Sequence, residues 1–176
     1  MSLGEPRVLG PEKIPSEAYF HTRWQTLRKP LGLPLGTERL PDDQQAIHAW
    51  VEDAEEIVAV GRAHLIPPES AGAMQDHSGA SASMCPSFTP LEGEEGFPQP
   101  MELRPAFHIR QMGTLVEWRR QGLAAQILQA LEEACVDIWK CNSGWLQARV
   151  GAIPFYESQG WTVFGEEYQI EGVGPH

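Results

Sequence analysis

The run from Arg119 to Ala124 has the composition of an anion-binding turn at the start of a helix. A helix N-terminus presents unpaired backbone N–H groups and a partial positive charge, which together attract anions. Gly122 and Ala124 project nothing beyond a methyl group, so a phosphate can approach the backbone there. Arg119 and Arg120 add charge and forked donors for phosphate oxygens. The run predicts a pyrophosphate site, although many helices that bind no anion begin in a similar way.

The predicted elements around this run come from hydrophobic periodicity and from turn residues. A strand leads directly into the run, and an amphipathic helix follows it. In chain order we expect strand 7–9, helix 16–28, strands 46–51 and 56–65 joined by a turn at 53–55, strand 107–114, helix 122–138, strand 145–149, helix 152–158 and strand 161–170. This order predicts an α/β protein with one mixed sheet and flanking helices, in a single domain over residues 1–176.

Residues 66–105 interrupt the pattern. Sixteen of these forty residues are Gly, Pro or Ser, and six are acidic against one basic. Such a composition buries little apolar surface to offset chain entropy. It predicts a long flexible insertion within the domain.

The formal net charge of −11 disfavours binding to nucleic acid and favours a cationic substrate such as an amine. No stretch is long and apolar enough to span a membrane, and Met1 to Pro6 does not read as a signal peptide. Cys85, Cys135 and Cys141 lack metal-ligand spacing, so we expect no metal site. These features favour a cytoplasmic protein.

Two downstream runs add to the anion-binding turn. Ala148-Arg149 ends a strand, and Phe155-Tyr156-Glu157-Ser158-Gln159-Gly160-Trp161 forms a helix, a glycine stop and a strand. Together with the segment from Met112 to Ala124, they resemble the GNAT superfamily of N-acetyltransferases. Leu27 to Gly32, Asp42-Asp43, Gly61 to His64 and the tail Gly172 to His176 are similar to its ElaA-like branch. The chain departs from the family at Arg120, where Gly is usual, at Val116, where Pro is common, and at Gln147, where Asn is frequent.

The resemblance implies a mostly antiparallel sheet and direct attack of a primary amine on the thioester of acetyl-CoA. It implies that acetyl-CoA is held by Met112, Gly113, Thr114, Arg119, Arg120, Gln121, Gly122, Leu123, Ala124, Gln147 and Phe155. Tyr156 would donate a proton to the sulfur, since a phenol stays protonated at neutral pH. His64 is the candidate base that we favour from the sequence, and His108, Glu117 or a chain of waters are the alternatives. Arg28, Arg62 and Arg149 are candidates to bind a substrate carboxylate, with Arg23 a further one.

Two other readings stay open. The protein could hold acyl-CoA without turning it over, or it could bind a partner protein through residues 66–105. An exposed strand at the edge of such a sheet would also allow a homodimer.

Overall fold

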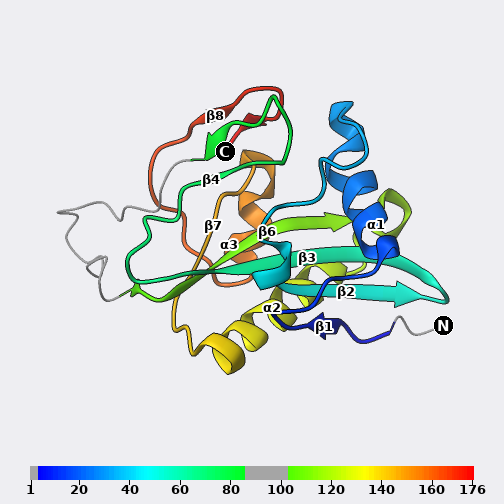
Figure 1. Cartoon of the computed structure of the whole chain (residues 1–176), viewed down its shortest axis with the longest axis horizontal. Helices are drawn as coiled ribbons and strands as arrows, with labels where there is room; N and C mark the ends of the chain where they lie inside the picture. The colour runs from blue at the N-terminus through cyan, green and yellow to red at the C-terminus, as the bar shows by residue number, and fades with distance from the viewer. Residues whose placement is uncertain (1–3, 86–102) are drawn as a thin grey trace.

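The computed structural model describes residues 4–85 and 103–176, which are built around one five-stranded sheet (Figure 1). Its strand order is β1-β2-β3-β6-β7. The strands are β1 (Arg7–Leu9), β2 (Ile47–Asp53), β3 (Glu56–Ile66), β6 (Ala106–Thr114) and β7 (Gly144–Leu146). The first four pair antiparallel, and β7 runs parallel to β6. The predicted mixed, mostly antiparallel sheet is therefore confirmed.

Two helices cover opposite faces of this sheet. The helix α1 (Glu17–Leu27) begins after Ser16, whose side chain accepts the N–H of Tyr19, as the sequence predicts for an N-cap. Tyr19 packs with Val60 on one face. The helix α2 (Leu123–Trp139) covers the other face, where a Cβ on Gly61 would meet Ile127 at 2.5 Å. Because neighbouring strand residues point to opposite faces, Val60 and Gly61 mark the α1 side and the α2 side.

The remaining elements are short. They are the 3-10 turns η1 (Lys29–Leu31), η2 (Asp43–Gln45), η4 (Val116–Trp118) and η5 (Val150–Ala152), the helix α3 (Ile153–Ser158), the hairpin β4 (Met74–Gln75) with β5 (Met84–Cys85), and the pair β8 (Gln169–Ile170) with β9 (Gly174–Pro175). Two predicted strands need correction. The strand expected at 145–149 ends at Leu146, and most of 161–170 is irregular. Gly165 adopts a left-handed backbone with φ 76°, which interrupts any extended run there.

The described part of the predicted insertion is more ordered than its composition suggests. Asp76 Oδ1 accepts the N–H of Ser83 at 2.8 Å and that of His77 at 3.0 Å, which closes the loop between β4 and β5. The sheet side holds this hairpin through Arg110, whose guanidinium donates to Gln75 O. Polar contacts therefore replace the apolar burial that the composition lacks. Residues 86–102 of the predicted insertion lie outside the described residues.

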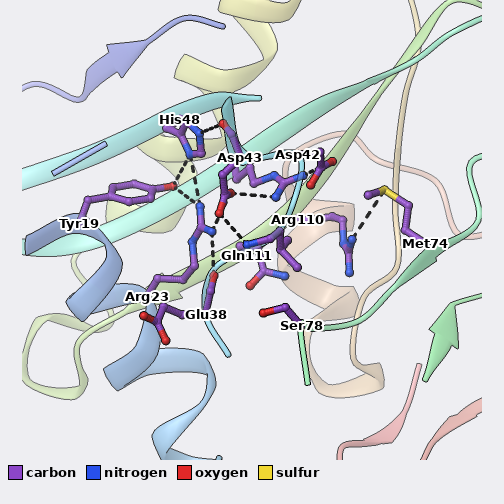
Figure 2. A network of polar contacts seen from close by, with 12 residues as sticks. Tyr19, Arg23, Glu38, Asp42, Asp43, His48, Met74, Ser78, Arg110 and Gln111 are labelled. Atoms are coloured by element: carbon purple, nitrogen blue, oxygen red, sulfur yellow. Dashed lines mark hydrogen bonds and ion pairs between the residues drawn. The ribbon is translucent and has the colours of Figure 1, made fainter. Parts of the chain in front are cut away.

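A buried charge cluster fixes the turn η2 against the α1 side of the sheet (Figure 2). Asp43 Oδ1 accepts from Arg23 Nη1 and from Arg62 Nη1, both at 2.9 Å. Its Oδ2 accepts the N–H of Leu40 at 2.7 Å, and Asp42 pairs with Arg62. Both arginines are fully buried, so each is compensated by an aspartate within the protein.

Candidate active site

A cavity of about 770 Å³ opens where β6 and β7 separate. The two strands pair only from Phe107 with Gly144 to Ile109 with Leu146, whereas β6 continues to Thr114. The start of α2 and the helix α3 form one part of its wall. The β4–β5 hairpin and the C-terminal tail, which lie side by side in Figure 1, also line it.

The strand β6 is irregular where it lines the cavity, along the part that has no pairing with β7. The pairing with β3 shifts between Val60 and Arg62, and Gln111 adopts a left-handed backbone with φ 57°. Beyond this bulge, the N–H of Leu115 donates to Val58 O on β3 at 3.0 Å. Since successive N–H groups alternate between the two edges of a strand, the N–H of Thr114 points to the edge that β7 has left. Met112, Gly113 and Thr114, which the sequence analysis proposed as cofactor-binding residues, all line the cavity.

The anion-binding turn lies in the same wall. Its α2 helix begins at Leu123 after Gly122, which has φ 80°, and its first helical hydrogen bond runs from Gln126 N–H to Gly122 O. A Cβ on Gly122 would meet nothing within 4 Å, so the approach to the unpaired N–H groups at the start of α2 is open. Five of the six predicted residues of the turn line the cavity: Arg119, Arg120, Gly122, Leu123 and Ala124. Gln121 does not line it, because its exposed side chain bends back to donate to Glu117 O.

Arg120 has the backbone of a glycine. Its φ is 63°, and a side chain in the left-handed region costs about 1 kcal/mol. We expect Arg120→Gly to raise the free energy of unfolding by about 1 kcal/mol and the Tm by about 2–4 °C, as measured by thermal denaturation. Arg120→Ala is the control, since it removes the same charge but keeps a Cβ in the strained conformation. Equal Tm values for the two variants would contradict the argument.

Tyr156 and Phe155 lie on α3, and both line the cavity. Their rings meet edge to face, with centroids 4.9 Å apart. Burial raises the pKa of Tyr156 to about 12, so its hydroxyl keeps its proton at any physiological pH. Gln147 follows β7 and lines the cavity as well. The arrangement offers a phenol donor opposite the free edge of β6.

The candidate bases separate by position. His108 on β6 lines the cavity, and burial, with the charges around it, lowers its pKa well below the usual value. His64 sits opposite His108 in the strand register, with ring centroids 4.6 Å apart, but it does not line the cavity. Burial, reinforced by Arg62 and Arg110, lowers the pKa of His64 to about 3. The structure places His64 beside His108 and outside the lining of the cavity, so its role as the base stays a prediction. Glu117 is exposed on η4, outside the wall.

The candidate carboxylate-binding arginines also divide. Arg28 and Arg149 line the cavity. Arg62 does not, because Asp42 and Asp43 hold it in the buried cluster, and Arg23 is held by Asp43 in the same way. Sequence reasoning missed a further group of lining residues: Arg110 and Gln111 on β6, Asp76, His77 and Cys85 around the hairpin, and His176 at the tail. Only Arg110 had a sequence signal, since it alternates with His108 along one strand face.

Comparisons with known proteins agree with this architecture. Residues 100–174 match the model of the acetyltransferase (GNAT) domain. An acyl-CoA N-acyltransferase from Pseudomonas aeruginosa superimposes with a TM-score of 0.68 at 16% identity, covering 99% of this chain and 96% of that one. The chain has the GNAT fold. Escherichia coli ElaA matches with the same TM-score, identity and coverage, so the resemblance predicted from sequence is confirmed.

A third similar structure was solved with acetyl-CoA bound. A predicted acetyltransferase from Clostridium acetobutylicum, solved with acetyl-CoA, superimposes with a TM-score of 0.58 at 14% identity and 95% coverage of both chains. Within residues 4–85 and 103–176 of the present chain, no cluster of His, Cys, Asp and Glu is arranged to hold a metal ion. In the same part of the chain, no helix has both the length and the apolarity needed to cross a bilayer.

Proposed function

We propose that the protein is an N-acyltransferase that transfers the acetyl group of acetyl-CoA to a primary amine by direct attack. One observation carries the proposal: the anion-binding turn, the free edge of β6 and Tyr156 all line a single cavity. These are an anchor for a pyrophosphate, a backbone donor for a carbonyl oxygen and a proton donor for a leaving group.

The chain's residues fit acetyl-CoA as the cosubstrate. The open approach at Gly122 and the charges of Arg119 and Arg120 would hold its pyrophosphate. When bound, acetyl-CoA supplies the activated acyl group. The N–H of Thr114 would be placed to stabilise negative charge on the acyl oxygen, an effect on the order of 3 kcal/mol in comparable sites. Tyr156 holds its proton ready for the departing sulfur.

The attacking amine must lose its proton, because a lysine-like amine has a pKa of about 10.4 in water. Of the candidate bases His64, His108 and Glu117, only His108 lines the cavity, and its lowered pKa keeps the ring neutral at physiological pH. We therefore propose His108 as the general base, acting directly or through a water, in place of His64.

Cys85, Cys135 and Cys141 are free thiols, which supports a reducing compartment such as the cytoplasm.

The cofactor site is tested by Gly122→Asp against Gly122→Asn. Asp and Asn tolerate the left-handed backbone about equally, so the pair differs in charge and hardly at all in strain or size. We expect Gly122→Asp to weaken acetyl-CoA binding by about 30-fold relative to Gly122→Asn, on the order of 2 kcal/mol, by isothermal titration calorimetry. Equal affinities for the two variants would remove the pyrophosphate from this turn.

Turnover is tested separately from binding. Acetyl-CoA should raise the Tm of the wild-type protein whether or not the protein is an enzyme, since any ligand of the native state does so. Only an enzyme, and not a binding protein without activity, releases free CoA thiol when it is given a panel of amines. A Tm increase with no thiol release from any amine would identify an acyl-CoA-binding protein without activity.

A further inference from the structure

Two arginines lie in the cavity wall away from the anion-binding turn. Arg28 follows the last residue of α1, and Arg110 lies on β6 just before the bulge. Their exposed fractions are only 6% and 9%. Both are among the residues that line the cavity, and the hairpin residue Asp76 lies in the same wall.

Among the described residues, every hydrogen-bond partner of these two guanidinium groups is neutral. Arg28 donates to Thr37 O at 3.1 Å, to the side-chain oxygen of Gln111 at 2.7 Å and to Asp76 O at 3.3 Å. Arg110 donates to Gln75 O at 2.5 Å and lies 3.7 Å from Met74 Sδ, the contact drawn in Figure 2. The hairpin thus holds both guanidinium groups through backbone oxygens and a thioether.

Neither arginine forms an ion pair with any described residue, in contrast to Arg62 in the adjacent buried cluster. The nearby carboxylates Asp76 and Glu38 attract Arg28 through space, but neither forms an ion pair with it. Asp76 accepts the N–H groups of His77 and Ser83, and Glu38 accepts the N–H of Gly36. Two largely buried cations therefore share one stretch of wall without a paired anion.

Such an arrangement is costly unless an anion completes it, because burial removes the hydration of each charge. Burial, together with the charges of Arg23 and Arg110, lowers the pKa of Arg28 to about 10, which is the direction expected for a cation without a counterion. The positive charge is local, since the chain as a whole carries a net charge of −11. An anionic group would be attracted to this part of the cavity and not to the protein surface in general.

We infer that the amine acceptor carries a carboxylate, and that Arg28 and Arg110 bind it. The inference rests on the proposed acetyl transfer and narrows its acceptor to an amino acid or a peptide with a free carboxylate. Forked guanidinium donors match the geometry of a carboxylate, and two of them fix its orientation. The anchored acceptor would present its amine to the acyl group held along β6.

The first test uses the wild-type protein and matched acceptors. Amino acids with two to six carbons between amine and carboxylate, together with α-amino acids, are each compared with their carboxamides in the thiol-release assay. We expect at least one carboxylate to exceed its own amide by about 30-fold in kcat/KM. Equal values across all pairs would overturn the inference and leave the proposed acetyl transfer standing.

The second test assigns the preference to the two arginines. Arg110→Met and Arg28→Met should each raise KM for the preferred carboxylate by about 30-fold, with little effect on its amide and an unchanged Tm increase by acetyl-CoA. Arg110→Lys keeps the charge and should recover part of the loss, which also covers the case in which Arg110→Met fails to fold. Lys29→Met, an exposed cation beside Arg28 that lies over Trp24, is the matched control. Equal losses for carboxylate and amide would contradict the assignment.

A binding measurement keeps the inference separate from the proposed activity. If no acceptor releases thiol, the proposed activity fails, but calorimetry with CoA present still compares each carboxylate with its amide. Binding of a carboxylate that Arg110→Met abolishes would support the inference. Absence of any preference for carboxylates in binding would overturn it.

Discussion

Replacement of Tyr156 by phenylalanine lowers kcat for acetyl transfer by about 100-fold and leaves the Kd for acetyl-CoA within about twofold. The two side chains differ only in the hydroxyl, and Tyr156 lines the cavity from α3. The hydroxyl acts when the sulfur departs, so its loss affects the reaction more than binding. Single-turnover kinetics, together with calorimetry of acetyl-CoA binding, measures both quantities on the same variant.

The pH profile gives an independent check of this role. Because burial raises the pKa of Tyr156 to about 12, its proton is not lost below about pH 10, and kcat should show no alkaline decline from this group in that range. Tyr168→Phe is the control, since this tyrosine is partly buried but does not line the cavity. An equal fall of kcat and acetyl-CoA affinity in Tyr156→Phe would remove the proton-donor role.

Asp43→Asn should lower the free energy of unfolding by about 3–5 kcal/mol at pH 7. The substitution preserves shape but removes the charge that faces Arg23 and Arg62, and both arginines remain buried. Urea denaturation followed by fluorescence measures the loss. Glu17→Gln is the control, because Glu17 pairs with Arg39 at the surface and should cost less than about 1 kcal/mol.

The stability difference between wild type and Asp43→Asn should also depend on pH. Burial alone would raise the pKa of Asp43, but Arg23, Arg62 and the N–H of Leu40 hold it below its usual value. A depressed folded-state pKa contributes stability above about pH 4, the unfolded value, and that contribution is lost as pH falls through the folded value. The gap between wild type and Asp43→Asn should therefore narrow below about pH 4. A gap of constant size would mean that lost packing or hydrogen bonding, and not charge, explains the effect.

Features coded by neighbouring residues could be predicted from the sequence. The Ser16 cap, the strand predicted over residues 56–65 and the turn before α2 each depend on a few adjacent side chains, and the structure contains all three. The strand predicted at 161–170 was mostly wrong, because that prediction also used only neighbouring residues. Its apolar residues alternate locally, but Gly165 turns the chain before any partner strand is reached.

The candidate site was predictable where one segment carries it and not where distant segments meet. Arg62 was proposed to bind substrate because the sequence does not show that Asp42 and Asp43, about twenty residues earlier, are its ion-pair partners. Arg110 was overlooked because its exposure to the cavity depends on where β7 ends. The net charge of −11 favoured a cationic acceptor, whereas the local charge near Arg28 and Arg110 has the opposite sign.

The cavity is assembled from parts that the chain encodes separately. The turn before α2 and the helix α3 face the proposed cofactor, whereas the hairpin between β3 and β6 supports the guanidinium groups proposed to bind the acceptor. Mutations in the hairpin can therefore change which amine is accepted without altering the cofactor cradle. For directed evolution, this makes residues 67–85 the segment to randomise, with selection for a new acceptor in a background of unchanged acetyl-CoA affinity.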